Sequence, residues 1–124
     1  MQIYSQHVGE ANIVAPKGRI DQATSEEFRM ALAPHVQECS STGNLLVVDM
    51  SGVDYISSAG LRCFVTAAKQ ARTQGGTIVV AAMQPTVQEI FEISRFTLLF
   101  EFFSSVREAV ATVAPGALAH LDQH

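Results

Sequence analysis

The polar side chains that could do chemistry gather behind one valine-rich stretch. In the segment VVDMSGVDYISSAGL, residues 47–61, two aspartates and three serines stand beside two glycines. Two of the serines, Ser57 and Ser58, are adjacent. Three roles are open to this pair: a helix cap, an enzyme nucleophile, or a site that a kinase modifies.

The nucleophile role lacks the partners that it needs. A serine nucleophile requires a nearby base, and the four histidines lie in no arrangement tied to this segment. They are His7, His35, His120 and His124. SSAG is not the G-x-S-x-G elbow of hydrolases, the aspartates lack the spacing of an EF-hand loop, and the glycines form neither a P-loop nor G-x-G-x-x-G. We therefore expect no catalytic residue, no metal site and no cofactor.

Helix geometry separates the two serines. At 100° per residue, Ser57 projects into the sector of the apolar side chains that follow, whereas Ser58 lies about 70° from the centre of that sector, toward Arg62 and Lys69. This predicts Ser57 as the helix cap, worth about 1 kcal/mol, and Ser58 as an outward hydroxyl. A phosphoryl group on Ser58 would lie in the first helical turn, where free N–H groups and the helix dipole favour an anion.

The elements that would position these serines follow from hydropathy patterning. NLLVVDM and TIVVAAM are continuously apolar, which is typical of strands covered on both faces in a parallel sheet. Between them, apolar residues recur at helical spacing over residues 61–68 and predict an amphipathic crossover helix that Gly75 and Gly76 end.

The flanking segments complete an α/β pattern. Residues 1–20 predict two strands joined at GE, and a helix is expected to start near Thr24, which forms a capping box with Glu27. Pro34 inside that helix predicts a kink or a helix in two parts. Pro85 suits the first turn of a short helix, FTLLFEFF predicts a final strand, and a second capping box at Ser105 starts the last helix.

The predicted order is ββαβαβαβα. This is a single α/β domain with a mixed, mostly parallel sheet of about five strands and about four helices. We expect the domain to cover residues 1–114. Residues 115–124 open with a Pro-Gly breaker and are expected to form a C-terminal tail that frays.

Composition narrows the class of partner. The chain has 124 residues and a formal net charge of -4, and its eight Lys and Arg are scattered singly, so we expect no binding to nucleic acid. No apolar run approaches the roughly 20 residues of a membrane span, so no direct membrane insertion is expected. With no signal-peptide pattern and two cysteines, Cys39 and Cys63, the expected location is the cytoplasm.

Several of these segments together carry a resemblance. The chain resembles a STAS domain and, within that superfamily, the small bacterial anti-sigma factor antagonists, also called anti-anti-sigma factors. The likeness runs from about residue 3 to residue 113 and is most specific in LLVVDMSGVDYISSAGLRCFVTAAKQARTQGG, where the strand, the D-x-S turn, the S-x-G-L helix start and the closing glycines fall in family order. GRIDQATSEEF resembles the family segment G-x-L-D-x-x-T, and EIFEISRFTLLFEFFSSVREAV resembles its last third.

The resemblance implies partner switching, a form of signal transduction that regulates transcription. The unphosphorylated domain binds an anti-sigma factor that is also a GHKL-type serine kinase, and this releases the sigma factor. Phosphorylation of one serine ends the binding, and a PP2C-type phosphatase restores it. Transferred to this chain, the phosphorylated serine is Ser58, two before Gly60, with Ser57 as the alternative; the chain is the substrate and not an enzyme.

The resemblance also implies a partner-binding surface. Its expected residues are Asp21, Thr24, Ser57, Ser58, Ala59, Gly60, Arg62, Thr66 and Lys69. Arg95 departs from the family, since many relatives have glycine there.

Two other functions stay open. One is a STAS subunit of a membrane transport or lipid-trafficking ABC assembly, and the other is a nucleotide-binding regulatory domain that uses a pocket beside Asp21 and Asp49.

Overall fold

One sheet organises the fold. The computed structural model describes residues 1–41, 43–95 and 100–122, and six strands within them form this sheet. The strands are β1 (Gln2–Val8), β2 (Ala11–Ile20), β3 (Leu45–Asp49), β4 (Val53–Ile56), β5 (Ile78–Ala81) and β6 (Glu101–Phe103). Their spatial order is β1-β2-β3-β5-β6, with β4 beside the second half of β2. Only β1 is antiparallel to its neighbour, so the sheet is mixed and mostly parallel, as predicted.

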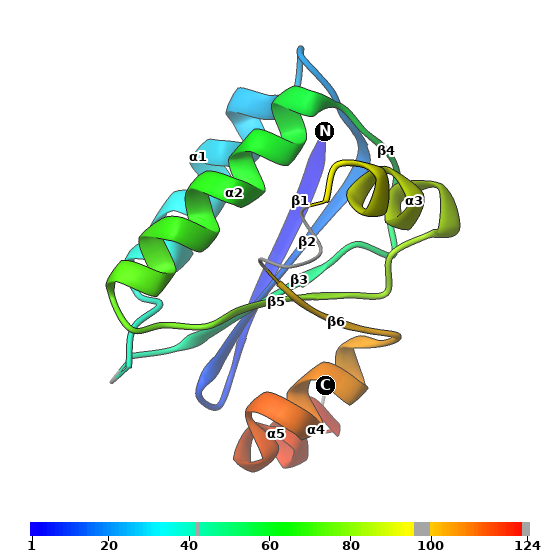
Figure 1. Ribbon diagram of the computed structural model, residues 1–124. Helices are drawn as coiled ribbons and strands as arrows, with labels where there is room; N and C mark the ends of the chain where they lie inside the picture. Colours follow the sequence, from blue (N-terminus) through cyan, green and yellow to red (C-terminus); the bar gives the residue numbers. More distant parts are fainter. Residues whose placement is uncertain (42, 96–99, 123–124) are drawn as a thin grey trace.

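Helices cover both faces of the sheet (Figure 1). They are α1 (Ser25–Gln37), α2 (Ser58–Thr73), α3 (Pro85–Ile93), α4 (Val106–Val113) and α5 (Leu118–Asp122), with a 3-10 turn η2 at Pro115–Ala117. Figure 1 shows α1 and α2 side by side on one face, and α4 with α5 at the opposite side of the sheet. Each face has its own hydrophobic core, because successive strand residues point to opposite faces and both faces of β3 and β5 are apolar. The first core lies on the face covered by α1, α2 and α3, and the second core lies on the face covered by α4 and η2.

An aromatic cluster anchors the helices of the first face. The ring of Phe64 on α2 lies 5.2 Å from Phe28 on α1 and 5.4 Å from Phe91 on α3. All three side chains are at most 1% exposed. Burying each ring stabilises the fold by about 2 kcal/mol, so these contacts help to fix how α1, α2 and α3 pack together.

The strand β4 was missing from the predicted order. Its residues lie in the polar segment before Ser57, for which the sequence pattern predicts no strand. In the structure they pair in parallel with the end of β2, where Ile56 lies opposite Ile20, and the register shifts between Gly18 and Arg19. The burial of Val53 and Ile56 supports this pairing, but a four-residue strand flanked by serines and glycines is too short to stand out in the sequence.

The other predictions about helices and strands had different outcomes. The helix α1 runs uninterrupted through Pro34, so the prediction of a helix in two parts is wrong. Pro34 has no N–H to donate to the carbonyl oxygen four residues earlier, but it lies in the last turn of α1, so only the end of the helix is affected. In the FTLLFEFF segment, residues 96–99 lie outside the described residues and β6 covers residues 101–103. Beyond Ala114, η2 and α5 follow, and Ala117 is fully buried in the second core. The domain boundary at residue 114 stays a prediction.

Arg95 has an unusual backbone. It follows the C-cap Ser94 of α3 and has φ of 60°, with its N–H donating to the carbonyl oxygen of Glu92 at 3.1 Å. A left-handed residue just after a helix is the conformation that glycine adopts without strain, so the backbone at Arg95 is strained where that of a glycine would not be.

Candidate functional site

The junction of β4 and α2 holds Ser57 in a fixed conformation. Its backbone is extended, with φ of -91° and ψ of 174°, and its N–H donates to the carbonyl oxygen of Ile20 at 2.8 Å. Its hydroxyl oxygen accepts the N–H of Gly60 at 3.2 Å, and its carbonyl oxygen accepts the N–H of Leu61 at 2.9 Å. The prediction that Ser57 caps the helix is confirmed.

Ser58 occupies the first position of α2 and is exposed. Within the described part of the chain its hydroxyl has no hydrogen-bond partner. The N–H groups in this first turn have no intrahelical acceptor, because each would need a carbonyl four residues earlier. A negative charge on Ser58 would therefore be favoured by the helix dipole and would break no existing contact of its hydroxyl.

Gly60 lets this turn approach the sheet closely. A Cβ atom at Gly60 would lie 2.7 Å from Cγ2 of Ile20, 2.8 Å from Cγ1 of Ile56 and 3.0 Å from the carbonyl oxygen of Ile20. The glycine is buried, so α2 begins in direct contact with the ends of β2 and β4. This contact holds the two serines at the edge of the sheet.

Asp21 closes the neighbouring turn between β2 and α1. One carboxylate oxygen accepts the N–H groups of Ala23 at 3.0 Å and Thr24 at 3.1 Å, and the other lies 3.6 Å from Nε of Arg19. Burial raises the pKa of Asp21, but the hydrogen bonds from Thr24 and Ala23, with the charge of Arg19, outweigh it and hold the pKa below the usual 3.8. The carboxylate thus stays charged and ordered beside the start of α1.

The capping box predicted at Thr24 is wrong. Thr24 does occupy the N-cap position of α1, but its side chain makes no capping hydrogen bond. Its hydroxyl accepts the N–H of Asp21 at 3.0 Å and donates to the carbonyl oxygen of Arg19 at 2.7 Å, so the tight turn uses it instead. The cap at Ser105 does form, since its hydroxyl oxygen accepts the N–H of Glu108 at 3.0 Å.

A hollow between the amino-terminal parts of α1 and α2 joins several expected residues. Its volume is about 210 Å³. Three of its lining residues, Ala59, Arg62 and Thr66, belong to the expected partner-binding surface. Residues that sequence reasoning missed complete the lining, namely Gln22, Ser25, Glu26, Arg29 and Cys63. The polar face of α1 was the signal that could have found them, had the helix pairing been known.

A smaller hollow of about 80 Å³ continues this groove along the two helices and shares Arg29, Cys63 and Thr66 with the first. Lys69, also expected on the surface, is exposed farther along α2.

Arg19 and Tyr55 form a further contact beside the junction. The guanidinium carbon of Arg19 lies 4.3 Å from the centre of the Tyr55 ring, a cation–π geometry across the β2–β4 pair. Neither residue was expected at the site, because the pairing that brings them together depends on the unpredicted strand β4.

The side chains of Cys63 and Asp49 contact backbone groups of neighbouring turns and helices. The Cys63 sulfur lies 3.5 Å from the carbonyl oxygens of Ser25 and Ala59, and burial raises the pKa of its thiol, which disfavours the reactive thiolate. Asp49 accepts the N–H of Ser51 at 3.0 Å and lines a hollow with Tyr4 of β1, a lining that does not include Asp21. Among the described residues, no three His, Cys, Asp or Glu side chains are grouped to hold a metal ion.

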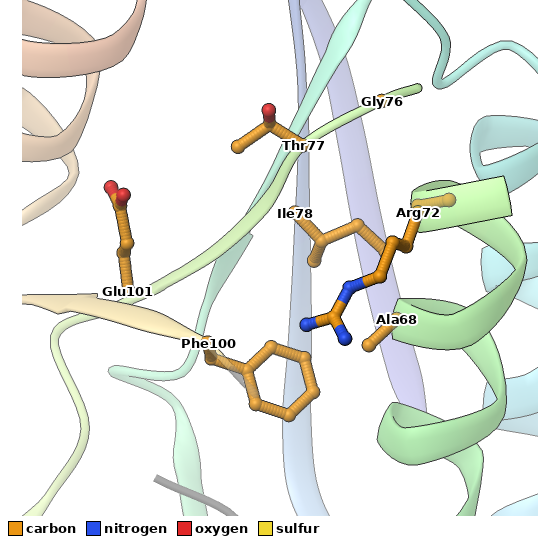
Figure 2. A pocket seen from close by; sticks show the side chains of 8 residues that line it. Ala68, Arg72, Gly76, Thr77, Ile78, Phe100 and Glu101 are labelled. Atoms are coloured by element: carbon orange, nitrogen blue, oxygen red, sulfur yellow. The ribbon is translucent and has the colours of Figure 1, made fainter. Parts of the chain in front are cut away.

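Another hollow, of about 280 Å³, lies at the opposite end of α2 (Figure 2). Figure 2 shows Arg72 of α2 and Glu101 of β6 on two sides of it, with Phe100 between the helix and the strand. The sequence did not point to this hollow, and it is separate from the serine junction because α2 runs between them.

Comparisons with known proteins place the chain in a family. The profile described as STAS domain matches residues 2–109, and the chain belongs to this family. A protein of Bordetella bronchiseptica named "Putative anti-sigma factor antagonist BtrV" is 38% identical over 106 residues, which are 86% of this chain and 88% of that one.

Solved structures show the same fold. An anti-sigma factor antagonist (STAS) domain protein of Planctomyces limnophilus superposes with a TM-score of 0.81 at 16% identity, covering 90% of this chain and 97% of that one. The anti-sigma factor antagonist SpoIIAA in its unphosphorylated form gives a TM-score of 0.74 at 14% identity, with 92% and 97% covered. In its phosphorylated form, Bacillus SpoIIAA gives 0.68 at 14% identity, with 90% and 99% covered.

No helix within the described ranges is both long and apolar enough to cross a membrane.

Proposed function

We propose that this protein is an anti-sigma factor antagonist that works by partner switching. Its unmodified form binds an anti-sigma factor that is also a GHKL-type serine kinase, in the cytoplasm of a bacterium, and phosphorylation of Ser58 ends the binding. The proposal rests on the difference between the two serines at the junction. The Ser57 hydroxyl oxygen accepts a hydrogen bond from the N–H of Gly60, whereas Ser58 is exposed. The name of the Bordetella bronchiseptica relative supports the class of partner.

The proposed docking surface is continuous around Ser58. It comprises the first turn of α2, the hollow lined by Ala59, Arg62 and Thr66, and the turn that Asp21 closes. Arg62 and Lys69 are exposed and offer positive charge, whereas Asp21 offers an ordered carboxylate. Such a mixed polar rim around a partly apolar hollow suits a reversible protein interface.

The chemical step needs only a hydroxyl from this chain. The Ser58 hydroxyl oxygen attacks the γ-phosphorus of ATP bound to the kinase, the bond to the β-phosphate oxygen breaks, and ADP leaves. The hydroxyl proton passes to a base of the kinase. A PP2C-type phosphatase then hydrolyses the phosphoserine with water, which returns the hydroxyl and releases inorganic phosphate.

The added charge accounts for the loss of binding. Phosphorylation adds about -1.5 to -2 charges near pH 7, which takes the chain from its formal -4 to about -6. Burying that charge against a partner without a matched cation costs several kcal/mol, and each 1.4 kcal/mol is tenfold in affinity. Arg62, one turn along α2, neutralises only part of the charge, so the phosphate both repels and occupies space in the interface.

The experiment combines phosphopeptide mapping with binding. The cognate kinase is incubated with the protein and ATP, and mass spectrometry locates the phosphate. We expect it on Ser58; modification of Ser57 alone would move the site and keep the mechanism. In calorimetric titration of the kinase, Ser58→Ala should bind like the unmodified protein and Ser58→Asp at least tenfold more weakly.

A matched control adds the same charge elsewhere. Ser41 is exposed on the chain segment that leads into β3, near Gly75 beyond the far end of α2, so Ser41→Asp should leave the affinity unchanged. Equal affinity for the unmodified protein, Ser58→Ala and Ser58→Asp would overturn the proposal.

A further inference from the structure

The strand β1 forms an open edge of the sheet. Within the described part of the chain it hydrogen bonds only to β2, so its other side presents unpaired backbone groups. At seven residues, Gln2–Val8, it is long for an edge strand. Its outward backbone is therefore available for pairing with another strand.

The hairpin fixes which residues face outward. Gly9 and Glu10 form a two-residue turn, with φ of 58° at Gly9, and Val8 lies opposite Ala11. In such a hairpin the residues that flank the turn share two hydrogen bonds, and the hydrogen-bonded residues then alternate along the strand. The alternation directs the N–H and C=O groups of the odd-numbered residues away from β2.

Pro16 agrees with this assignment. It lies opposite Ile3, and a proline has no N–H to donate to β1. The outward groups therefore belong to Ile3, Ser5 and His7.

This edge lacks the usual protection against strand pairing. Natural edge strands are blunted by charged side chains, prolines or bulges, whereas QIYSQHV contains no Lys, Arg, Asp, Glu or Pro and pairs with β2 in regular register. Most of its side chains are exposed, and Tyr4 is 53% exposed.

A series of side-chain hydrogen bonds also holds the end of β1 next to the hairpin turn in place. The carboxylate of Glu38 accepts the side-chain N–H of Asn12 at 3.0 Å, which leaves the Asn12 oxygen, 2.8 Å from Nδ1 of His7, to accept the ring N–H. Asn12 is 3% exposed, so this end of the strand is ordered before any partner arrives.

We propose that β1 pairs with β1 of a second copy of this chain and forms an antiparallel, two-fold symmetric dimer. The outward residues are symmetric about Ser5: Ser5 pairs with Ser5 of the second copy and Ile3 with His7, which gives about six inter-chain hydrogen bonds. An identical strand thus satisfies every outward group. Because β1 carries no charged side chain, the two strands do not repel each other although each chain carries a net charge of -4.

The dimer leaves the Ser58 junction free. The strand β4 and the start of α2 lie on the side of β2 opposite to β1, so the paired edge and the proposed docking surface are separate. The inference goes beyond the proposed function, and the failure of either leaves the other in place.

Sedimentation velocity of the full chain over a range from about 5 µM to about 500 µM tests the dimer. The mass should rise toward twice the 13.4 kDa of one chain. Ser5→Pro removes an outward N–H that β2 does not use and should weaken the dimer at least tenfold, whereas Ser5→Ala keeps the N–H and should not. Ser5→Lys places two like charges at the symmetry axis and should also weaken it, which covers the case that the proline variant does not fold.

Hydrogen exchange gives a second, residue-specific result. The amides of Ile3, Ser5 and His7 should gain protection as the concentration rises, while those of Tyr4 and Gln6 should be protected throughout. A monomer at every concentration, or a dimer that both Ser5→Pro and Ser5→Lys leave intact, would overturn the proposal.

Discussion

Replacing Gly60 by alanine tests how α2 is seated on the sheet. The added methyl group would lie 2.7 Å from Cγ2 of Ile20 and 2.8 Å from Cγ1 of Ile56, and real Cβ atoms essentially never come within 3.0 Å of other heavy atoms. Both isoleucines are at most 1% exposed and packed in the first core, so neither side chain has room to turn away. The start of the helix must move instead.

The cost follows from this geometry. Adding a methyl group to a well-packed core costs typically about 1 to 3 kcal/mol. Alanine has the better helix propensity by about 1 kcal/mol, which offsets part of that cost. The third contact, 3.0 Å from the carbonyl oxygen of Ile20, involves backbone that also accepts the N–H of Ser57, so the loss should reach about 2 kcal/mol.

Urea denaturation followed by circular dichroism measures this loss. Gly116→Ala is the matched control, because the nearest atom to a Cβ there is a carboxylate oxygen of Glu10 at 3.8 Å; its free energy of unfolding should be unchanged or higher. Gly60→Ala should also weaken kinase binding, since the Ser57–Ser58 turn is displaced. Equal stability of Gly60→Ala and the unmodified protein would refute the close seating of α2.

Three further substitutions test single features of the structure. Ser57→Ala should lower the free energy of unfolding by about 1 kcal/mol through loss of the cap, whereas Ser58→Ala should change it by less than about 0.5 kcal/mol; similar losses in urea denaturation would contradict the assignment of the cap. Arg95→Gly should stabilise the protein by about 1 kcal/mol because glycine adopts φ of 60° without strain, while Arg95→Ala should not; thermal unfolding measures both. Asp21 has a pKa held below 3.8, so its charge stabilises the fold above that value and this contribution is lost as the pH falls through the lowered pKa. The difference in Tm between the unmodified protein and Asp21→Asn should therefore be present near pH 7 and become smaller as the pH falls below 3.8, and a difference that does not change with pH would argue against a role for the charge.

Local patterns predicted the elements where one physical signal dominated. The apolar runs at residues 45–48 and 78–80 are continuous, which is typical of central parallel strands, and both strands were confirmed. The cap at Ser57 follows from its place before an amphipathic helix, and its hydrogen bond to Gly60 confirmed it.

Patterns failed where a longer-range contact competed with a local one. Thr24 and Glu27 match a capping box, but the Thr24 hydroxyl hydrogen bonds to Asp21 in the preceding turn and does not cap the helix. The strand β4 is stable only because β2 continues far enough to pair with it, and four residues alone carry too weak a signal.

The candidate site shows the same division. Its residues on α2 share one helix and were expected together from the family resemblance, and the structure places Ala59, Arg62 and Thr66 along the lining of one hollow. The contributions from α1 and from the β2–β4 pair were missed, among them Arg29 and Tyr55, because they are distant in sequence.

The sequence by itself determined the order of the elements apart from β4, η2 and α5, the family resemblance, and the difference between a capping Ser57 and an outward Ser58. These depend on interactions within a few residues, which periodicity and capping preferences encode directly. Only the tertiary structure decided that α1 lines the hollow beside Ser58, that β4 joins the sheet, and that β1, among the residues the structure describes, has a neighbouring strand on one side alone. Each of these depends on which distant segments pack together, and that is settled by burial of the whole apolar surface rather than by any local pattern.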